Sequence, residues 1–151
     1  MHCVIASPVG RLRIDADNCA ITGVKRTAEA LRPPHSPLLE ECVRQLNAYF
    51  QGRLTGFDLP LRMAGTPFRM KVWNALRRIP YGETCSYGQL AAMIGQPKAS
   101  RAVGGANHHN PISIIVPCHR VIGADGTLTG YGGGLDMKQW LLEHERKDHH
   151  A

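Results

Sequence analysis

The chain has 151 residues, of which 43% are hydrophobic and 20% are charged, and its formal net charge is +6. This composition is typical of a soluble protein of one or two small domains, and it excludes a membrane-spanning protein because no apolar run approaches the roughly 20 residues that cross a bilayer. The five cysteines are scattered and form no CxxC pair, which disfavours a disulfide framework or a structural zinc site and favours a reducing, cytoplasmic location.

The positive charge is concentrated in one part of the chain. Residues 69–120 carry seven basic side chains and one acidic side chain, Glu83. Residues 1–68 carry eight basic and six acidic side chains, and residues 121–151 carry three basic and five acidic ones. A basic stretch of this kind favours a polyanionic partner such as nucleic acid, although a solvated helix face without a partner has the same composition.

The first domain is expected to span residues 1–62 and to be a structural α/β domain. Short apolar segments separated by turn-forming residues predict a small antiparallel sheet, with strands near residues 4–6, 12–14 and 21–24. Three prolines in residues 32–37 end this sheet. Ser36 and Pro37 then predict a helix start, and Gly52 closes the helix after a series of apolar residues at helical spacing.

The second domain is expected to span residues 63–151. Thr66 and Pro67 predict the start of a helix whose apolar side continues to Ile79. Helical patterns dominate the rest of this domain. The predicted fold class is therefore α+β, with a small antiparallel sheet and a helix followed by a mainly helical domain.

A helix-turn-helix pattern lies within the second domain. Ser86 and Gln89 have the spacing of a capping box, which predicts a short helix over residues 87–94. Gly95 ends that helix, and a second helix is expected over residues 98–107.

The second of these helices is composed mainly of small residues, and Arg101 is its only large side chain after Lys98. The small residues are Ala99, Ser100, Ala102, Gly104, Gly105 and Ala106. A helix that reads base edges usually carries several long polar side chains. This composition therefore fits either shallow packing on DNA, with Arg101 inserted into the duplex, or close packing against another helix of the same domain.

A cysteine directly follows a short apolar run. Residues 112–116 have the composition of a buried strand, and Pro117 is expected to end it because proline has no N–H to donate. Cys118 comes next, followed at once by His119 and Arg120. Basic and cationic neighbours favour the thiolate, so the order predicts an activated nucleophile, with a buried structural cysteine as the alternative.

A glycine-rich loop and a final helix complete the second domain. Tyr131 stands among four glycines in residues 129–134, where the ring is available either to stack on a base or to pack on the core. Apolar residues at helical spacing follow, and Glu145 lies near the end of the last predicted helix.

Taken in order, the motifs of the second domain resemble those of the O6-alkylguanine-DNA alkyltransferase family, the methylated-DNA–protein-cysteine methyltransferases. The motifs are YGETCSYGQLA (81–91), RAVGGA (101–106), NP (110–111), VPCHRVI (116–122), GYGGG (130–134) and KQWLLEHE (138–145). The first sixty residues match weakly, chiefly through residues 7–10.

The resemblance implies roles for the catalytic residues. Cys118 would accept the alkyl group. His119 would take the thiol proton through a water, and Glu145 would orient His119. Asn110 would organise the site beneath the cysteine turn.

It also implies roles in DNA binding. Arg101 would enter the duplex and fill the gap left by the extruded nucleotide, with Ser100 and Ala99 beside it at the DNA surface. Tyr87 would press on the phosphate next to the target and protonate the leaving guanine.

The base pocket would be lined by Tyr131 and the Gly132 backbone, with the Val121 carbonyl reading the exocyclic amine. Gly132 stands where some relatives have serine, so a hydroxyl contact to O6 is absent. The resemblance implies no cofactor and no metal, because the zinc-binding residues of some relatives have no clear counterparts. The histidine-rich loop expected at residues 107–109 receives no role.

The implied function is DNA repair. The protein would flip O6-alkylguanine, and also O4-alkylthymine, out of double-stranded DNA and transfer the alkyl group irreversibly to Cys118, once per molecule. It would act as a monomer, with cooperative binding along DNA left open, and without a membrane partner. The alternatives are a non-catalytic lesion sensor or DNA-binding regulator, which needs no thiol, and a thiol hydrolase, which needs no helix-turn-helix.

Overall fold

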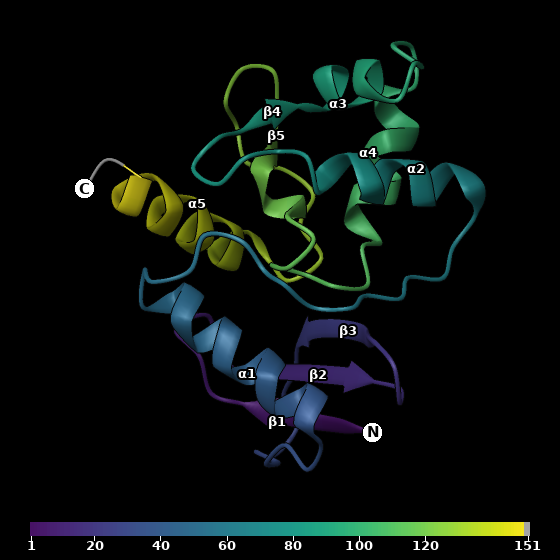
Figure 1. Ribbon diagram of the computed structural model, residues 1–151. Coiled ribbons are helices and arrows are strands. Elements are labelled where there is room, and N and C mark those ends of the chain that lie inside the picture. The colour runs from purple at the N-terminus through teal and green to yellow at the C-terminus, as the bar shows by residue number, and fades with distance from the viewer. Residues whose placement is uncertain (150–151) are drawn as a thin grey trace. The chain divides into compact units, whose positions relative to one another are not determined.

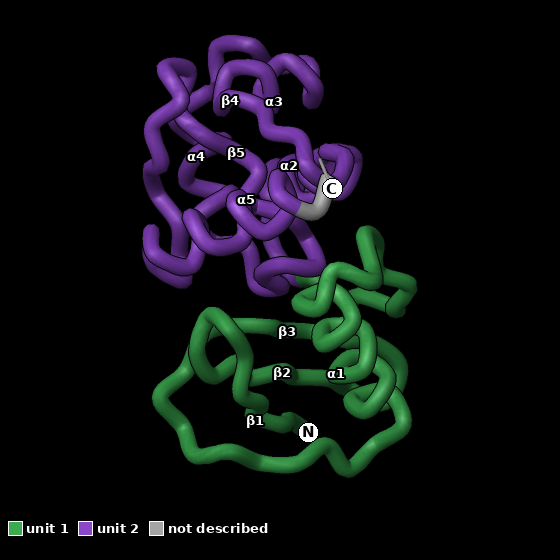
Figure 2. Tube along the Cα trace, turned by 90° about the vertical axis from the view of Figure 1, so that its left-hand side faces the viewer, with its two compact units in different colours: residues 1–63 green, residues 64–151 purple. Residues whose placement is uncertain are grey.

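The computed structural model describes residues 1–149, and the chain divides into two compact units, residues 1–63 and 64–151 (Figure 2). This division lies one residue after the boundary expected from the sequence. Residues 150–151 of the expected second domain lie outside the described part of the chain. None of the helices within residues 1–149 is long and apolar enough to cross a bilayer.

Unit 1 is a three-stranded antiparallel sheet with one helix (Figure 1). Its elements are β1 (His2–Ile5), β2 (Leu12–Ala16), β3 (Ile21–Arg26) and α1 (Pro37–Phe50). Along the central strand, Leu12, Ile14 and Ala16 are buried and alternate with partly exposed residues. This period of two points alternate side chains to the core, where α1 covers the sheet.

The start of α1 follows the sequence prediction. The Ser36 hydroxyl accepts the N–H of Leu39 at 3.2 Å, and Pro37 occupies the first turn. Buried Gln45 then ties the helix to the chain beyond it. Its Nε2 donates to the Asp58 carbonyl oxygen at 2.9 Å, and its Oε1 accepts the Asp58 N–H at 2.9 Å.

Unit 2 is mainly helical and contains the predicted helix-turn-helix, so the α+β fold class is confirmed. Its helices are α2 (Pro67–Leu76), α3 (Tyr87–Met93), α4 (Ser100–His108) and α5 (Leu135–His149), with the short 3-10 helix η1 (Cys118–Arg120). A small parallel sheet joins β4 (Cys85–Ser86) to β5 (Val121–Ile122). This pairing brings the start of the helix-turn-helix beside the segment that follows η1 (Figure 1).

Several helix boundaries of unit 2 differ from their predictions by one to three residues. The capping box of Ser86 and Gln89 is present as predicted. However, α2 ends at Leu76, because the Ile79 N–H bonds to the Leu76 carbonyl at 3.1 Å in a tighter turn. The second helix of the pair begins at Ser100 instead of residue 98.

Residues 112–116 do not form the predicted strand. Four of their five side chains are buried, as a core strand would require, but the backbone makes tight turns. The N–H of Ile115 donates to the Ser113 carbonyl at 2.8 Å across Ile114, whose φ is 73°. This is γ-turn geometry, which is strained for a β-branched residue. A short apolar run indicates burial but does not distinguish a strand from another buried segment.

Candidate active site

Cys118 is the first residue of η1 and is buried, with 3% of its surface exposed. Pro117 before it has φ −82° and ψ 64°, and the Cys118 N–H donates to the Val116 carbonyl at 2.8 Å. This hydrogen bond closes an inverse γ-turn. Because the proline ring fixes φ, the turn holds the sulfur in one place inside unit 2.

The segment before Cys118 is held by the side chain of Asn110. Nδ2 donates to the carbonyl oxygens of Val116 at 2.8 Å and Ile112 at 3.3 Å. Oδ1 accepts the N–H of Ile112 at 3.1 Å. These three bonds satisfy backbone groups that a strand would have paired with a neighbouring strand. The structure therefore places Asn110 beneath the cysteine turn.

A buried network links His119 to Glu145 in α5 and to Arg120. His119 Nε2 lies 2.6 Å from Glu145 Oε2. Arg120 Nε donates to Glu145 Oε1 at 2.7 Å, and its Nη2 donates to Oε2 at 3.1 Å. An ionised carboxylate only accepts hydrogen bonds, so Nε2 carries the ring proton. The lone pair of Nδ1 is then the basic position of His119, and no hydrogen bond within the described residues occupies this buried atom.

Burial sets the resting protonation states of the cysteine and the histidine. Burial raises the pKa of Cys118, and polar neighbours that include the Lys138 ammonium offset this only in part. Burial likewise lowers the pKa of His119, and Glu145 offsets this only in part. At neutral pH the thiol keeps its proton beside a neutral imidazole. The expectation of a thiolate favoured by adjacent cations is therefore wrong for the resting state, because burial of Cys118 outweighs its polar and cationic neighbours.

Tyr131 and Lys138 are buried near the thiol. Tyr131 is 6% exposed, and its burial and the neighbouring Cys118 raise its pKa. Lys138 is 0% exposed, and its Nζ donates to the Thr129 carbonyl at 2.7 Å. Burial lowers the pKa of Lys138 to about 8. The sequence analysis assigned Lys138 no role, although it lies two helical turns before Glu145 and therefore on the same helix face.

Asn107 is a second site residue that the sequence analysis missed. The expected histidine-rich loop is the last turn of α4, and Asn107 is 1% exposed. Its Nδ2 donates to the Cys118 carbonyl oxygen at 3.3 Å. The available signal was helical spacing, because Asn107 follows the buried Val103 by four residues and so shares its face.

The two faces of α4 fit the two interpretations of its small residues. Its buried face packs on α2, where Trp73 Nε1 donates to the Ala106 carbonyl at 2.8 Å. On the opposite face Arg101, Ala102 and Gly105 are exposed. Ala99 and Ser100 are half-buried at the start of the helix, where no side chain caps the backbone N–H groups.

Tyr87 begins α3 and reaches the glycine-rich loop. Its hydroxyl donates to the Thr129 carbonyl at 3.0 Å, the same oxygen that accepts the bond from Lys138. The ring lies close to Gly104 of α4, where an added Cβ would be 3.7 Å away. Tyr87 therefore connects both helices of the helix-turn-helix to the loop that carries Tyr131.

The remaining predicted pocket residues lie on two further segments. Val121 is buried in β5 and pairs with Cys85 of β4. Gly132 is exposed, and a Cβ added there would lie 3.1 Å from the His108 carbonyl oxygen at the end of α4. A serine at this position would therefore need a small shift of that backbone.

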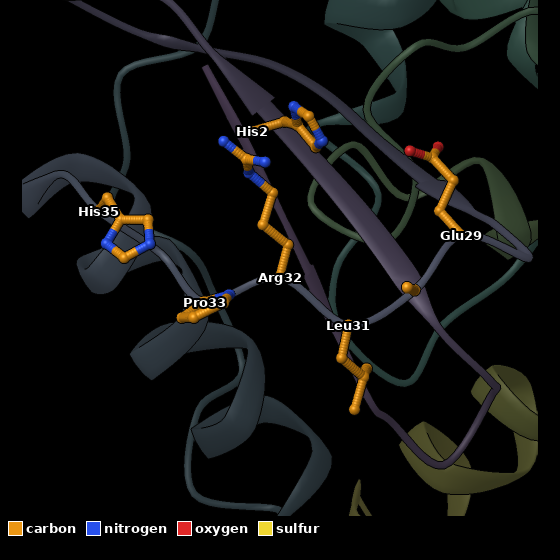
Figure 3. A pocket seen from close by; sticks show the side chains of 7 residues that line it. His2, Glu29, Leu31, Arg32, Pro33 and His35 are labelled. Carbon is orange, nitrogen blue, oxygen red and sulfur yellow. The ribbon is translucent and has the colours of Figure 1, made fainter.

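An open pocket of about 600 Å³ also lies in unit 1. His2, Arg32 and His35 contribute to its lining, and Figure 3 shows the Arg32 and His2 side chains close to each other. Glu29 lines the same pocket but bonds to Arg13. The lining of this pocket contains no cysteine.

Comparison with known proteins assigns both units to one family. Residues 67–147 match the 6-O-methylguanine DNA methyltransferase, DNA binding domain, and residues 1–63 match the ribonuclease-like domain of the same methyltransferases. The methylated-DNA–protein-cysteine methyltransferase of Mycolicibacterium paratuberculosis is 50% identical over 95% of this chain and 90% of its own. That of Methanosarcina acetivorans is 49% identical over 95% of this chain and 97% of its own.

A solved structure agrees with these matches. The crystal structure of Mycobacterium tuberculosis OGT in complex with DNA superposes with a TM-score of 0.90, at 51% identity, over 97% of this chain and 93% of that one. The chain therefore belongs to the 6-O-methylguanine DNA methyltransferase family and is a methylated-DNA–protein-cysteine methyltransferase.

Proposed function

We propose that this protein repairs duplex DNA by moving the alkyl group of O6-alkylguanine, and of O4-alkylthymine, to Sγ of Cys118. The observation that carries the proposal is a buried thiol next to a neutral imidazole, whose far nitrogen is 2.6 Å from a buried carboxylate. This is the arrangement of a base-activated nucleophile. It lies in the same unit as α4, which has one exposed face and an N-terminus without a side-chain cap, as suits contact with a phosphate backbone.

The transfer begins with loss of the thiol proton. His119 Nδ1 accepts it, through one bridging water, and Sγ then attacks the alkyl carbon in line with the carbon–oxygen bond. That bond breaks, and its electron pair leaves with the guanine, which takes up one proton. Tyr87 is the proposed donor of that proton, since its hydroxyl borders the glycine-rich loop.

The product on the protein is a thioether, which has no ready leaving group. Each molecule therefore acts once. Because a sulfur oxidised to a disulfide cannot act as the acceptor, a reducing compartment such as the cytoplasm suits the reaction.

The base must leave the duplex to reach a thiol that is 3% exposed. Arg101 is the proposed wedge, because it is exposed in the first turn of α4, and Ser100 and Ala99 lie beside it near the phosphate backbone. The flipped base would lie against Tyr131 and the Gly132 backbone, with its amine facing the Val121 carbonyl. We propose that one protein molecule binds each lesion.

Intact-mass analysis tests the chemistry directly. The protein is mixed with a duplex that carries one O6-methylguanine, and a Cys118→Ser variant is the matched control. The wild-type chain should gain a single CH2, located on the peptide that contains Cys118, at no more than one per molecule. A lesion sensor would bind the duplex and keep its mass, and modification of another peptide would remove Cys118 as the acceptor.

A further inference from the structure

Arg120 is a basic residue that the fold removes from the surface. It is 7% exposed, and its guanidinium bonds to both oxygens of Glu145. Its remaining amino group, Nη1, donates to the Ile79 carbonyl oxygen at 2.6 Å. The side chain is thus held by α5 and by the turn after α2, and its charge lies in the interior of unit 2.

The Glu145 carboxylate is shared between His119 and Arg120, and its Oε1 also accepts the N–H of Gly82 at 3.4 Å. Its Oε2 is 2.6 Å from His119 Nε2 and 3.1 Å from Arg120 Nη2. The guanidinium therefore fixes the plane of the carboxylate and, through it, the orientation of the imidazole. It also neutralises the negative charge that would otherwise stabilise a protonated His119.

We propose that Arg120 is a positioning residue that keeps His119 neutral, so that its free nitrogen is available to accept the cysteine proton. This inference rests on the proposed role of His119 as the base. A doubly protonated imidazole has no lone pair for that step. Without the charge of Arg120, the Glu145 carboxylate would favour the protonated form of His119.

Burial is the main reason that the pKa of His119 lies below its usual value, and the charged groups that face the ring act on that pKa in opposite directions. From α5, Glu145 favours its protonation and the Lys138 ammonium opposes it. From η1, Arg120 opposes it, and the neighbouring Cys118 is an uncharged thiol at neutral pH. Tyr131, in the loop before α5, is also uncharged because its pKa lies well above the usual value. Removing the charge of Arg120 therefore leaves Glu145 as the closest ionised group to the ring.

Arg120 places a positive charge within hydrogen-bond distance of both oxygens of the Glu145 carboxylate. Although burial raises the pKa of Glu145, its hydrogen bonds and ion pairs with His119 and Arg120 lower it well below the usual range. Lys138 is committed to the Thr129 carbonyl oxygen at 2.7 Å. In an Arg120→Met variant, the negative charge of Glu145 is no longer offset by the guanidinium. It then stabilises the protonated form of His119.

NMR titration of ¹⁵N-labelled histidine in the full-length protein tests this directly. In the wild type, the His119 signals should be those of a neutral ring at pH 7 with the proton on Nε2. In Arg120→Met, the His119 pKa should rise by about 1–3 units. Arg120→Lys keeps the positive charge but loses the bidentate contact with Glu145, so a smaller rise of the His119 pKa is expected. Arg78→Met, at an exposed arginine of the same unit, should leave His119 unchanged.

The rate of alkyl transfer from a soluble O6-benzylguanine probe supplies the second readout. The acidic limb of its pH profile should move to higher pH in Arg120→Met by the same amount as the His119 pKa, while the rate above that limb recovers. A merely structural role would lower the rate equally at every pH.

An imidazolium at pH 7 in the wild type would overturn the proposal, and this measurement needs no variant to fold. An unchanged His119 pKa in folded Arg120→Lys or Arg120→Met, together with an unmoved acidic limb, would also overturn it. If the wild-type protein instead titrates as expected but never becomes alkylated, the proposed function fails and the role of Arg120 in the resting site stands.

Discussion

Asn107 donates a hydrogen bond from Nδ2 to the carbonyl oxygen of Cys118 at 3.3 Å. Asn107 is in the last turn of α4, the second helix of the helix-turn-helix. One buried amide therefore ties the helix proposed to lie on DNA to the backbone of the proposed acceptor. Through this hydrogen bond, a shift of α4 on binding DNA would also shift the backbone that carries the Cys118 sulfur.

Replacing Asn107 by leucine should lower the free energy of unfolding by about 0.5–1.5 kcal/mol, because the buried Cys118 carbonyl oxygen loses one of its two donors and keeps only the N–H of Val121. Transfer from a free-base probe should also slow, since η1, which carries Cys118, is then held less firmly. Urea unfolding and probe labelling measure the two effects. His108→Ala, at the exposed neighbouring residue, is the control and should stay within about 0.5 kcal/mol of the wild type. If the Asn107→Leu variant is destabilised but is labelled at the wild-type rate, the contact contributes to stability and not to alkyl transfer.

Gly133→Ala should disturb the base pocket. An added Cβ would lie 2.7 Å from Met137 Sδ and 2.9 Å from Cε2 of the Tyr131 ring, and both are buried. Such overpacking costs about 1–3 kcal/mol, and probe labelling should slow as Tyr131 moves. Gly105→Ala is the matched change, because nothing lies within 4 Å of its Cβ position. Because residue 105 lies within α4, Gly105→Ala should raise the free energy of unfolding by about 0.5–1 kcal/mol and leave probe labelling unchanged. Equal behaviour of the two variants would contradict the close packing around Tyr131.

Lys138→Met should change how stability depends on pH. The pKa of Lys138 falls to about 8 in the folded protein, against about 10.4 in the unfolded chain. Between these values the unfolded chain binds more protons, so this residue makes the wild type more stable as the pH rises from about 8 to about 10.4.

The quantity to measure is the difference in unfolding free energy between Lys138→Met and the wild type at each pH, because the titrations of Cys3, Cys42 and Cys85, on which Lys138 does not act, cancel in it. That difference should move in favour of the wild type by roughly 2–3 kcal/mol across the interval. Lys71→Met, at an exposed lysine of α2, should give a flat difference. A difference that does not change with pH for Lys138→Met would show that burial does not lower the pKa of Lys138.

Arg101→Ala should impair repair of duplex DNA more than reaction with a free base. Arg101 is exposed, so unfolding should change by no more than about 0.5 kcal/mol. If the side chain fills the gap in the duplex, each 1.4 kcal/mol of lost support for the flipped state slows repair about tenfold. Single-turnover rates on duplex and on free probe are compared, with Arg78→Ala as the charge-matched control. Equal slowing on both substrates would remove Arg101 from base extrusion.

Local signals in the sequence were sufficient where a structure depends on neighbouring residues. The hydroxyls of Ser36 and Ser86 cap their helices as predicted, because a cap requires only a hydroxyl and a backbone N–H three residues later. The motifs around Cys118 likewise predicted the family. The strand at residues 112–116 was wrong, because an apolar run does not reveal that Asn110 satisfies its backbone from the side.

The order of residues in the chain determined the two-unit α+β plan, the helix-turn-helix and the candidate nucleophile, since these follow from spacing, capping and motif order. Only the tertiary structure decided the chemical state of the site. It turned Arg120 inward onto Glu145, buried Lys138 and Asn107 beside Cys118, and left the thiol protonated next to a neutral imidazole. The physical reason is that a pKa depends on burial and on charges from distant segments, and these are defined only once the chain has folded.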